Sequence, residues 1–200
     1  MKRFIYLISP NKIDKNFYTN LKKVLSSKKV KYFQLRVKGK TNSYLITNSK
    51  KIKTITDKFK VKLIINDSPK VAKTVKAAGC HIGQSDASFI TAKKILKKRM
   101  VGVTCHGSNN LIDRAIKNKA DYIAIGSFFD SKLKPNAKKA NIRIIKETKK
   151  KTKIPIVAIG GINNKNYKKL ISLGANYIAI SSFIWNNPFL KPETAIKKFK

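Results

Sequence analysis

Two acidic residues, Asp67 and Asp86, follow short apolar segments in a chain that carries 46 lysines and arginines but only nine acidic residues. Asp67 comes directly after segment 61–66, and Asp86 comes shortly after segment 80–83. If both segments are neighbouring parallel strands of a barrel, their carboxyl ends bring the two side chains to one rim. One or two carboxylates together with phosphate oxygens are the usual ligands of Mg2+. The pair therefore predicts a magnesium site; the alternative is that each aspartate only caps the helix that follows it.

Three polar residues alternate with apolar ones in the second half of segment 31–37 and directly after it. Gln34, Arg36 and Lys38 lie two residues apart, so a strand would turn all three side chains to the same face. Polar groups that point into a barrel are costly unless they meet a ligand. Two cations beside a pair of carboxylates therefore predict a site for a phosphorylated anion.

Other expected strand ends add polar groups to the same rim. Asn66, Thr104 and Lys134 each lie at or after the end of one apolar segment. The pairs Gly160–Gly161 and Ser181–Ser182 place backbone N–H groups near expected helix starts, which is a common arrangement for binding phosphate. The alternative for the glycine pair is tight packing alone.

Short apolar segments alternate with longer segments of helical periodicity along the whole chain. The apolar segments are mostly continuous, which is typical of parallel strands covered on both faces. One of them, in residues 120–129, returns in residues 175–184, an offset close to that of two strand–helix units. Eight such units predict a single (β/α)8 barrel over residues 1–200, rather than an open doubly wound sheet, because no Gly-rich turn follows the first strand. The expected strands are 3–9, 31–37, 61–66, 80–83, 100–105, 122–129, 154–162 and 177–184, and the expected helices are 16–29, 43–59, 68–79, 89–98, 109–120, 137–151, 164–175 and 193–200.

The strong positive charge does not by itself predict a nucleic-acid-binding protein. The net charge is +37, but 41 of the 46 cationic residues are lysine and only five are arginine, the residue that dominates specific base readout. The lysines are spread over expected helix faces, so we expect small anionic substrates as partners rather than nucleic acid. The first apolar stretch is too short for a signal peptide or a membrane span, and the two cysteines show no metal or disulfide spacing. We therefore expect a cytoplasmic protein with no membrane partner.

Several of these segments resemble one family in order and spacing. "FQLRVK", "IIND", "HIGQSD", "VGVT", "YIAIGSFF", "IVAIGGI" and "YIAISS" are similar to the motifs of thiamine-phosphate synthase, and the match runs over nearly the whole chain. The resemblance implies a (β/α)8 barrel that joins a pyrimidine diphosphate, 4-amino-2-methyl-5-(diphosphomethyl)pyrimidine, to a thiazole phosphate. Pyrophosphate would be released with the help of Mg2+, and the product would be thiamine phosphate.

The resemblance also implies a role for each matching position. The pyrimidine diphosphate would be bound by Gln34, Arg36, Lys38, Asn66 and Thr104, and Mg2+ would be held by Asp67 and Asp86. The thiazole phosphate would be bound by Ser131, Leu133, Gly161, Ser181 and Ser182, while Lys134 would reach the diphosphate. The residues expected to act in catalysis are Arg36, Lys38, Thr104 and Lys134.

Three positions depart from the family pattern. The loop after the sixth strand usually reads Thr-x-Thr-Lys in this family, whereas residues 131–134 read Ser-Lys-Leu-Lys. Leu133 can offer a phosphate only its backbone N–H, so thiazole-phosphate binding would be weaker or altered there. Thr104 stands where serine is usual and keeps the hydroxyl.

Two other functions remain open at the level of sequence. A thiazole tautomerase shares this fold, and His106 could then carry a proton, since imidazole titrates near neutral pH. The retained Asp67, Asp86 and Lys134 favour the synthase, because a tautomerase has no diphosphate to activate. The remaining alternative is a non-catalytic barrel that binds anions or nucleic acid.

Overall fold

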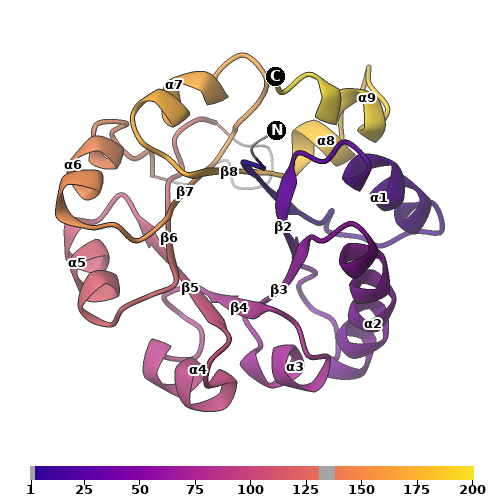
Figure 1. Cartoon of the computed structure of the whole chain (residues 1–200), viewed down its shortest axis with the longest axis horizontal. Coiled ribbons are helices and arrows are strands. Elements are labelled where there is room, and N and C mark those ends of the chain that lie inside the picture. Colours follow the sequence, from indigo (N-terminus) through magenta and orange to yellow (C-terminus); the bar gives the residue numbers. More distant parts are fainter. Residues whose placement is uncertain (1–2, 131–137) are drawn as a thin grey trace.

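A computed structural model describes residues 3–130 and 138–200, and its strands close into one barrel (Figure 1). The order is β1-β2-β3-β4-β5-β6-β7-β8, with every neighbouring pair parallel and β8 returning to β1. The strands are β1 Ile5–Ile8, β2 Val30–Leu35, β3 Lys62–Asn66, β4 Gly79–Ile82, β5 Met100–His106, β6 Tyr122–Ile125, β7 Ile156–Ile159 and β8 Tyr177–Ile180. The predicted (β/α)8 barrel is confirmed, and the open doubly wound sheet is wrong.

Helices follow the strands and form a ring outside the barrel (Figure 1). Their bounds are α1 Phe17–Leu25, α2 Asn42–Lys58, α3 Pro69–Thr74, α4 Phe89–Leu96, α5 Asn109–Lys117, α6 Ile144–Lys151, α7 Tyr167–Ser172, α8 Ser182–Trp185 and α9 Pro192–Lys197. Side-chain caps fix several starts: the hydroxyl of Ser68 accepts from the Val71 N–H, and Pro69 occupies the first turn. Such caps let the chain turn from strand to helix within a few residues, which keeps the loops on the rim short.

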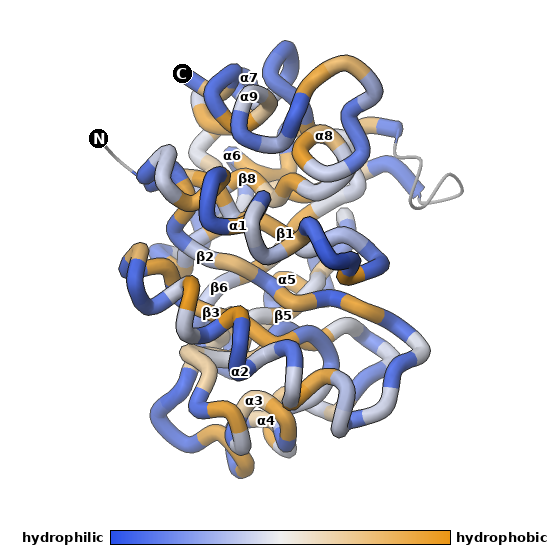
Figure 2. Tube along the Cα trace, turned by 90° about the vertical axis from the view of Figure 1, so that its right-hand side faces the viewer, coloured by the Kyte–Doolittle hydropathy of each residue, from blue (hydrophilic) through white to orange (hydrophobic). Residues whose placement is uncertain are grey.

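The core has two layers, as strand alternation requires. Outward-facing strand residues such as Ile5 and Leu7 pack with the helices in a large cluster, while the barrel interior is filled by a separate smaller one. The hydropathy-coloured trace shows apolar segments running through the middle of the molecule, where the strands lie (Figure 2). The interior cluster consists of Tyr6, Ile8, Tyr32, Ile64, Tyr122, Ala124, Val157 and Ala179.

The boundaries of two expected strands were wrong in ways that matter for the site. β2 ends at Leu35, so Arg36 and Lys38 lie beyond it, and strand alternation does not set their direction. β8 ends at Ile180, and after Ser181 the chain continues as the short helix α8, which begins at Ser182. The rim beyond the strand ends therefore holds Arg36 and Lys38 after β2 and Ser181 and Ser182 after β8, whereas Gln34 stays inside β2.

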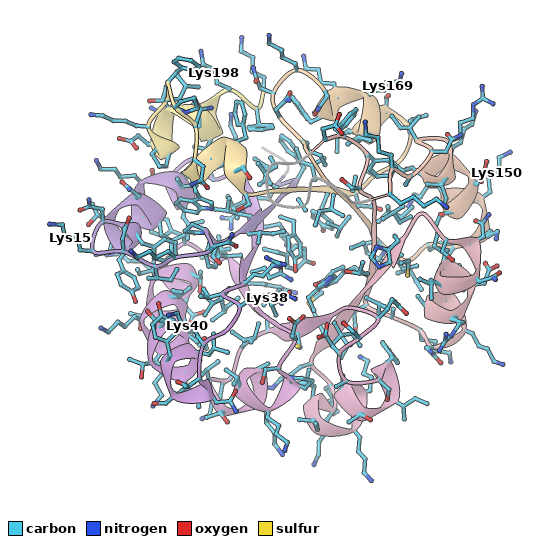
Figure 3. The ribbon with its side chains drawn as sticks, turned by 180° about the vertical axis from the view of Figure 1, so that it is seen from behind. Lys15, Lys38, Lys40, Lys150, Lys169 and Lys198 are labelled. Atoms are coloured by element: carbon cyan, nitrogen blue, oxygen red, sulfur yellow. The ribbon has the colours of Figure 1, made fainter. Side chains whose placement is uncertain are left out.

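Several lysines extend outward from the barrel, and one lies over its mouth. Lys15, Lys150, Lys169 and Lys198 extend from the outer edge of the molecule, whereas Lys38 lies near the centre of the ring (Figure 3). Within residues 3–130 and 138–200, no helix has both the length and the apolar character needed to cross a bilayer.

Candidate active site

The structure brings the two predicted metal ligands together at the carboxyl ends of β3 and β4. The Asp67 N–H donates to the carbonyl of His81 across the two strands, at 2.8 Å. Asp86 folds back over the next loop, where its Oδ2 accepts from the Gly83 N–H at 2.7 Å. Burial raises the pKa of Asp67 to about 6, and a hydrogen bond to Asp86 and the charge of Asp86 act in the same direction. Two carboxylates are therefore held close enough to repel each other.

The backbone of Asp67 makes this placement possible. Its φ is 61°, in the left-handed region that side chains other than glycine rarely adopt and that aspartate tolerates better than most. Only Ser68 separates Asp67 from the first residue of α3. The capping hydroxyl for α3 comes from Ser68, so Asp67 does not cap this helix, and the structural alternative for Asp67 does not apply.

Cations approach the carboxylates from the β2 side. Lys38 Nζ lies 3.8 Å from Asp67 Oδ2, and Lys38 and Arg36 both act to lower the pKa of Asp67, against the larger effect of burial. Arg36 is fixed through its backbone, because its N–H donates to the Ser9 hydroxyl at 2.9 Å and its carbonyl accepts from that hydroxyl at 3.2 Å. Gln34 is 2% exposed at the end of β2, beside Ile64 of β3.

A buried line of hydrogen bonds joins the barrel interior to this rim. The hydroxyls of Tyr6 and Tyr122 lie 2.7 Å apart, Tyr122 Oη lies 3.0 Å from His81 Nδ1, and His81 Nε2 lies 2.7 Å from Thr104 Oγ1. Burial lowers the pKa of His81 to about 4. Of these four residues, only Thr104 was expected from the sequence as a site residue.

A glycine in β5 leaves the space that the ring of Tyr122 occupies. A Cβ atom at Gly102 would lie 1.9 Å from Cζ of Tyr122, so the Tyr122 ring fills the space that a side chain would take. The ring then stacks on that of His81, with centroids 5.6 Å apart and planes 13° apart. The available sequence signal was therefore a glycine in an otherwise apolar strand, opposite a histidine on the neighbouring strand.

The side of the rim formed by β7 and β8 is built differently. Gly161 has φ 60°, and a Cβ there would lie 2.3 Å from the carbonyl oxygen of Asp130, so the glycine lets two loops touch. The Ser181 hydroxyl donates to the carbonyl of Ser9 at 3.0 Å, and Ser182 begins α8. Tight packing at Gly161 is thus present, and these residues offer backbone N–H groups rather than charges.

The remaining predicted residues fall into two groups. Asn66 ends β3 at the same rim as Asp67. His106 ends β5 with its side chain exposed. Ser131, Leu133 and Lys134 lie outside the residues that the structure describes.

The donor set at the rim suits a hard divalent cation. In the described parts of the chain, no group of three or more His, Cys, Asp or Glu side chains could hold a metal by itself. Asp67 and Asp86 supply two carboxylates whose mutual repulsion a cation would relieve, and Mg2+ commonly completes such a set with phosphate oxygens and water. The chemistry of the pair therefore fits Mg2+ bound together with a phosphorylated substrate.

Comparison with known proteins gives the same family along the whole chain. The family described as "Thiamine monophosphate synthase" matches residues 5–184. The thiamine-phosphate synthase of Pelagibacter ubique (strain HTCC1062) is 54% identical over 200 residues, which cover 100% of this chain and 97% of the relative. The thiamine-phosphate synthase of Erythrobacter litoralis (strain HTCC2594) is 36% identical over 187 residues, which cover 91% of this chain and 88% of the relative.

A solved structure supports the fold. The thiamine phosphate pyrophosphorylase from Pyrococcus furiosus matches with a TM-score of 0.88 at 24% sequence identity, covering 98% of this chain and 93% of that one. The family expected from the sequence motifs is thus confirmed by full-length relatives. The chain belongs to the thiamine-phosphate synthase family and is a transferase of that family.

Proposed function

We propose that this chain joins 4-amino-2-methyl-5-(diphosphomethyl)pyrimidine to a thiazole phosphate, with release of pyrophosphate, and that the reaction takes place at the rim around Asp67. The observation that carries the proposal is the approach of Asp67, Asp86 and Lys38 at one point of the barrel mouth. Without a bound cation, the two negatively charged carboxylates repel each other. A divalent cation together with a diphosphate gives both of them a favourable partner.

The residues would have different roles in stabilising the negative charge that develops on the diphosphate leaving group. Asp67 and Asp86 would hold Mg2+, which supplies positive charge to a diphosphate leaving group. Arg36 and Lys38 add fixed positive charge on the β2 side, where the departing oxygens become more negative as the carbon–oxygen bond loosens. Lys134 is proposed to reach the same diphosphate. No side-chain nucleophile is needed, because the thiazole nitrogen attacks the pyrimidine methylene carbon.

The other predicted residues would position the two substrates. Gln34 of β2, Asn66 of β3 and Thr104 of β5 would hold the pyrimidine diphosphate, and a substrate held in the reactive orientation reacts faster. The thiazole phosphate is proposed to bind across the mouth, and its ligands would be Ser131, the Leu133 N–H, Gly161, Ser181 and Ser182. A phosphate there would meet backbone N–H groups near the start of α8.

The two cysteines bear on where the protein acts. Cys80 and Cys105 are both buried and unpaired, as expected in a reducing compartment. We propose that the protein acts in the cytoplasm, with small phosphorylated molecules as its partners. The alternative of a tautomerase depended on His106, whose exposed side chain makes no hydrogen bond within the described residues.

The test is pyrophosphate release by the purified full-length chain. We expect release only when both substrates and Mg2+ are present, with thiamine phosphate formed in equal amount. A change in the thiazole phosphate alone, without pyrophosphate, would identify a tautomerase instead. Binding of the diphosphate without turnover, in the presence of the second substrate, would identify a non-catalytic barrel.

A further inference from the structure

The line Tyr6–Tyr122–His81–Thr104 has four side chains joined by three hydrogen bonds, so the direction of each bond can be worked out. Each hydroxyl carries one hydrogen and a neutral imidazole carries one ring N–H, which gives four hydrogens for three bonds. The spare hydrogen can therefore be on Tyr6, on Tyr122 or on Thr104. Tyr6 stands at the interior end and Thr104 at the rim end.

The interior end cannot hold the spare hydrogen without a penalty. Tyr6 is 2% exposed, and among the described residues its hydroxyl has Tyr122 as its hydrogen-bond partner. A buried hydroxyl hydrogen without an acceptor is unfavourable, because the lost hydrogen bond to water is not replaced. The Tyr6 hydroxyl must therefore donate to Tyr122.

The remaining directions follow one by one. Tyr122 is 1% exposed and accepts from Tyr6, so its own hydrogen goes to its other partner, His81 Nδ1. With Nδ1 accepting, the ring hydrogen sits on Nε2 and is donated to Thr104 Oγ1. The hydrogen of the Thr104 hydroxyl is then the one left over.

Other protonation states fail the same count. If Thr104 donated to Nε2, then Nδ1–H would donate to Tyr122. Tyr122 would then either donate to Tyr6, which leaves the Tyr6 hydrogen without an acceptor, or accept from Tyr6 as well, which leaves its own buried hydrogen without one. If the imidazole carried both hydrogens, one of the two tyrosine hydrogens would again have none. Burial of His81, which lowers its pKa to about 4, agrees with the neutral form.

We propose that Tyr122 is a positioning residue that fixes His81 as the Nε2–H tautomer and so makes the Thr104 hydroxyl a hydrogen-bond donor toward the substrate. This inference rests on the proposed function, in which Thr104 faces the pyrimidine diphosphate. The ligand group that it takes is a lone-pair acceptor of that substrate, a ring nitrogen or a diphosphate oxygen. A fixed donor is aligned before the substrate arrives, so no hydroxyl has to reorient during the reaction.

The first test reads the tautomer and does not depend on activity. The chain contains two histidines, so a 15N spectrum of the histidine-labelled protein has two imidazoles to assign, and His106→Gln removes one of them. We expect His81 to show a protonated Nε2 and a pyridine-like Nδ1 in the free protein at neutral pH. A protonated Nδ1, alone or together with Nε2, would overturn the proposal whether or not the protein turns over substrate.

The second test uses two variants that each remove one buried tyrosine hydroxyl. Tyr122→Phe removes the donor to His81, so we expect a measurable share of the Nδ1–H form and a loss of about fivefold in kcat/KM for the pyrimidine diphosphate. The KM for the thiazole phosphate should stay unchanged, because the effect is local to the pyrimidine diphosphate. A general loss of structure would instead raise the KM for both substrates. Tyr6→Phe is the matched control: Tyr122 still has His81 to donate to, so the tautomer and the kinetics should stay within about twofold of the parent.

The outcomes separate the two levels of inference. If Tyr122→Phe and Tyr6→Phe lowered kcat/KM equally for both substrates, the four side chains would have only a packing role. That result would overturn the positioning role of Tyr122. If Tyr122→Phe does not fold, the spectrum of the parent protein still decides the tautomer. If the parent protein releases no pyrophosphate while His81 shows the Nε2–H form, the proposed function fails and the assigned hydrogen-bond direction stands.

Discussion

The two sides of the barrel mouth are constructed by different means. The side formed by β2, β3, β4 and β5 is built from side chains: two carboxylates, a lysine, and a histidine tied to a threonine. The side formed by β7 and β8 is built from backbone, with Gly161 in close contact with the preceding loop and Ser181 bonded to the carbonyl of Ser9. Among the residues named here, the charged side chains lie on the first side and the second side offers mainly backbone groups. Such a division suits a reaction in which one substrate loses an anionic leaving group and the other only has to be held.

The largest effect is expected on the side-chain half, from Asp67→Asn and Asp86→Asn. Each change removes one of the two negative charges proposed to hold Mg2+ while keeping the size of the side chain. We expect each to lower the rate of pyrophosphate release by about 100- to 1,000-fold at saturating substrate.

The matched control is Asp113→Asn, an exposed aspartate whose Oδ1 pairs with Lys151 Nζ at 2.9 Å. It removes the same charge from the surface, and its rate should equal that of the parent chain. If Asp67→Asn or Asp86→Asn were as active as Asp113→Asn, that aspartate would not bind a catalytic metal. The proposed contrast between the two sides of the mouth would then be wrong.

The backbone half is tested by Gly161→Ala, which should act on stability. The new Cβ would meet the Asp130 carbonyl oxygen at 2.3 Å in a left-handed conformation, so we expect a loss of about 3 kcal/mol in the free energy of unfolding. Gly39→Ala is the control, because Gly39 has φ 70° but nothing within 4 Å of the position that a Cβ would take. It should cost only the conformational part, about 1 kcal/mol. Chemical denaturation measures both, and equal losses would show that Gly161 is needed for its φ and not for the contact between the loops.

The division also explains what could be read from the sequence. The barrel was predictable because continuous apolar segments of strand length repeat with helices between them, and that pattern is local. The Asp67–Asp86 proximity was predictable from the fold rule that carboxyl ends of parallel strands share a rim. Scarce carboxylates in a lysine-rich chain made the two positions stand out.

The tyrosine–histidine line could not be read in the same way. Tyr6 and Tyr122 are 116 residues apart, and each looks like an ordinary apolar strand residue in its own segment. Their meeting depends on the closure of the barrel and on the absent side chain at Gly102, which are properties of the assembled fold. The direction of Arg36 and Lys38 was also beyond reach, because alternation applies only up to Leu35, where β2 ends.

The smallest expected effect concerns the cost of the carboxylate pair in the protein without metal. The pKa of Asp67 is raised to about 6 from an ordinary value of 3.8, so the folded state holds this proton more tightly than the unfolded state does. Between these two pH values the unfolded chain has lost the proton and the folded chain has kept it. The contribution of Asp67 to stability is therefore highest below pH 3.8, falls as pH rises, and is lowest above pH 6.

Asp67→Asn removes this cost, and we expect the variant to be more stable than the parent by about 1 kcal/mol at pH 7.5 in the presence of a chelator, a value discounted because the carboxylate is partly solvated. The gain should vanish below about pH 4, where the parent carboxyl is itself neutral. Denaturation curves at several pH values measure the difference, and Asp113→Asn should show no such gain. A variant less stable than the parent at pH 7.5 would mean that Lys38 and Arg36 already compensate the pair. The side-chain half would then carry no stored repulsion for a metal to relieve.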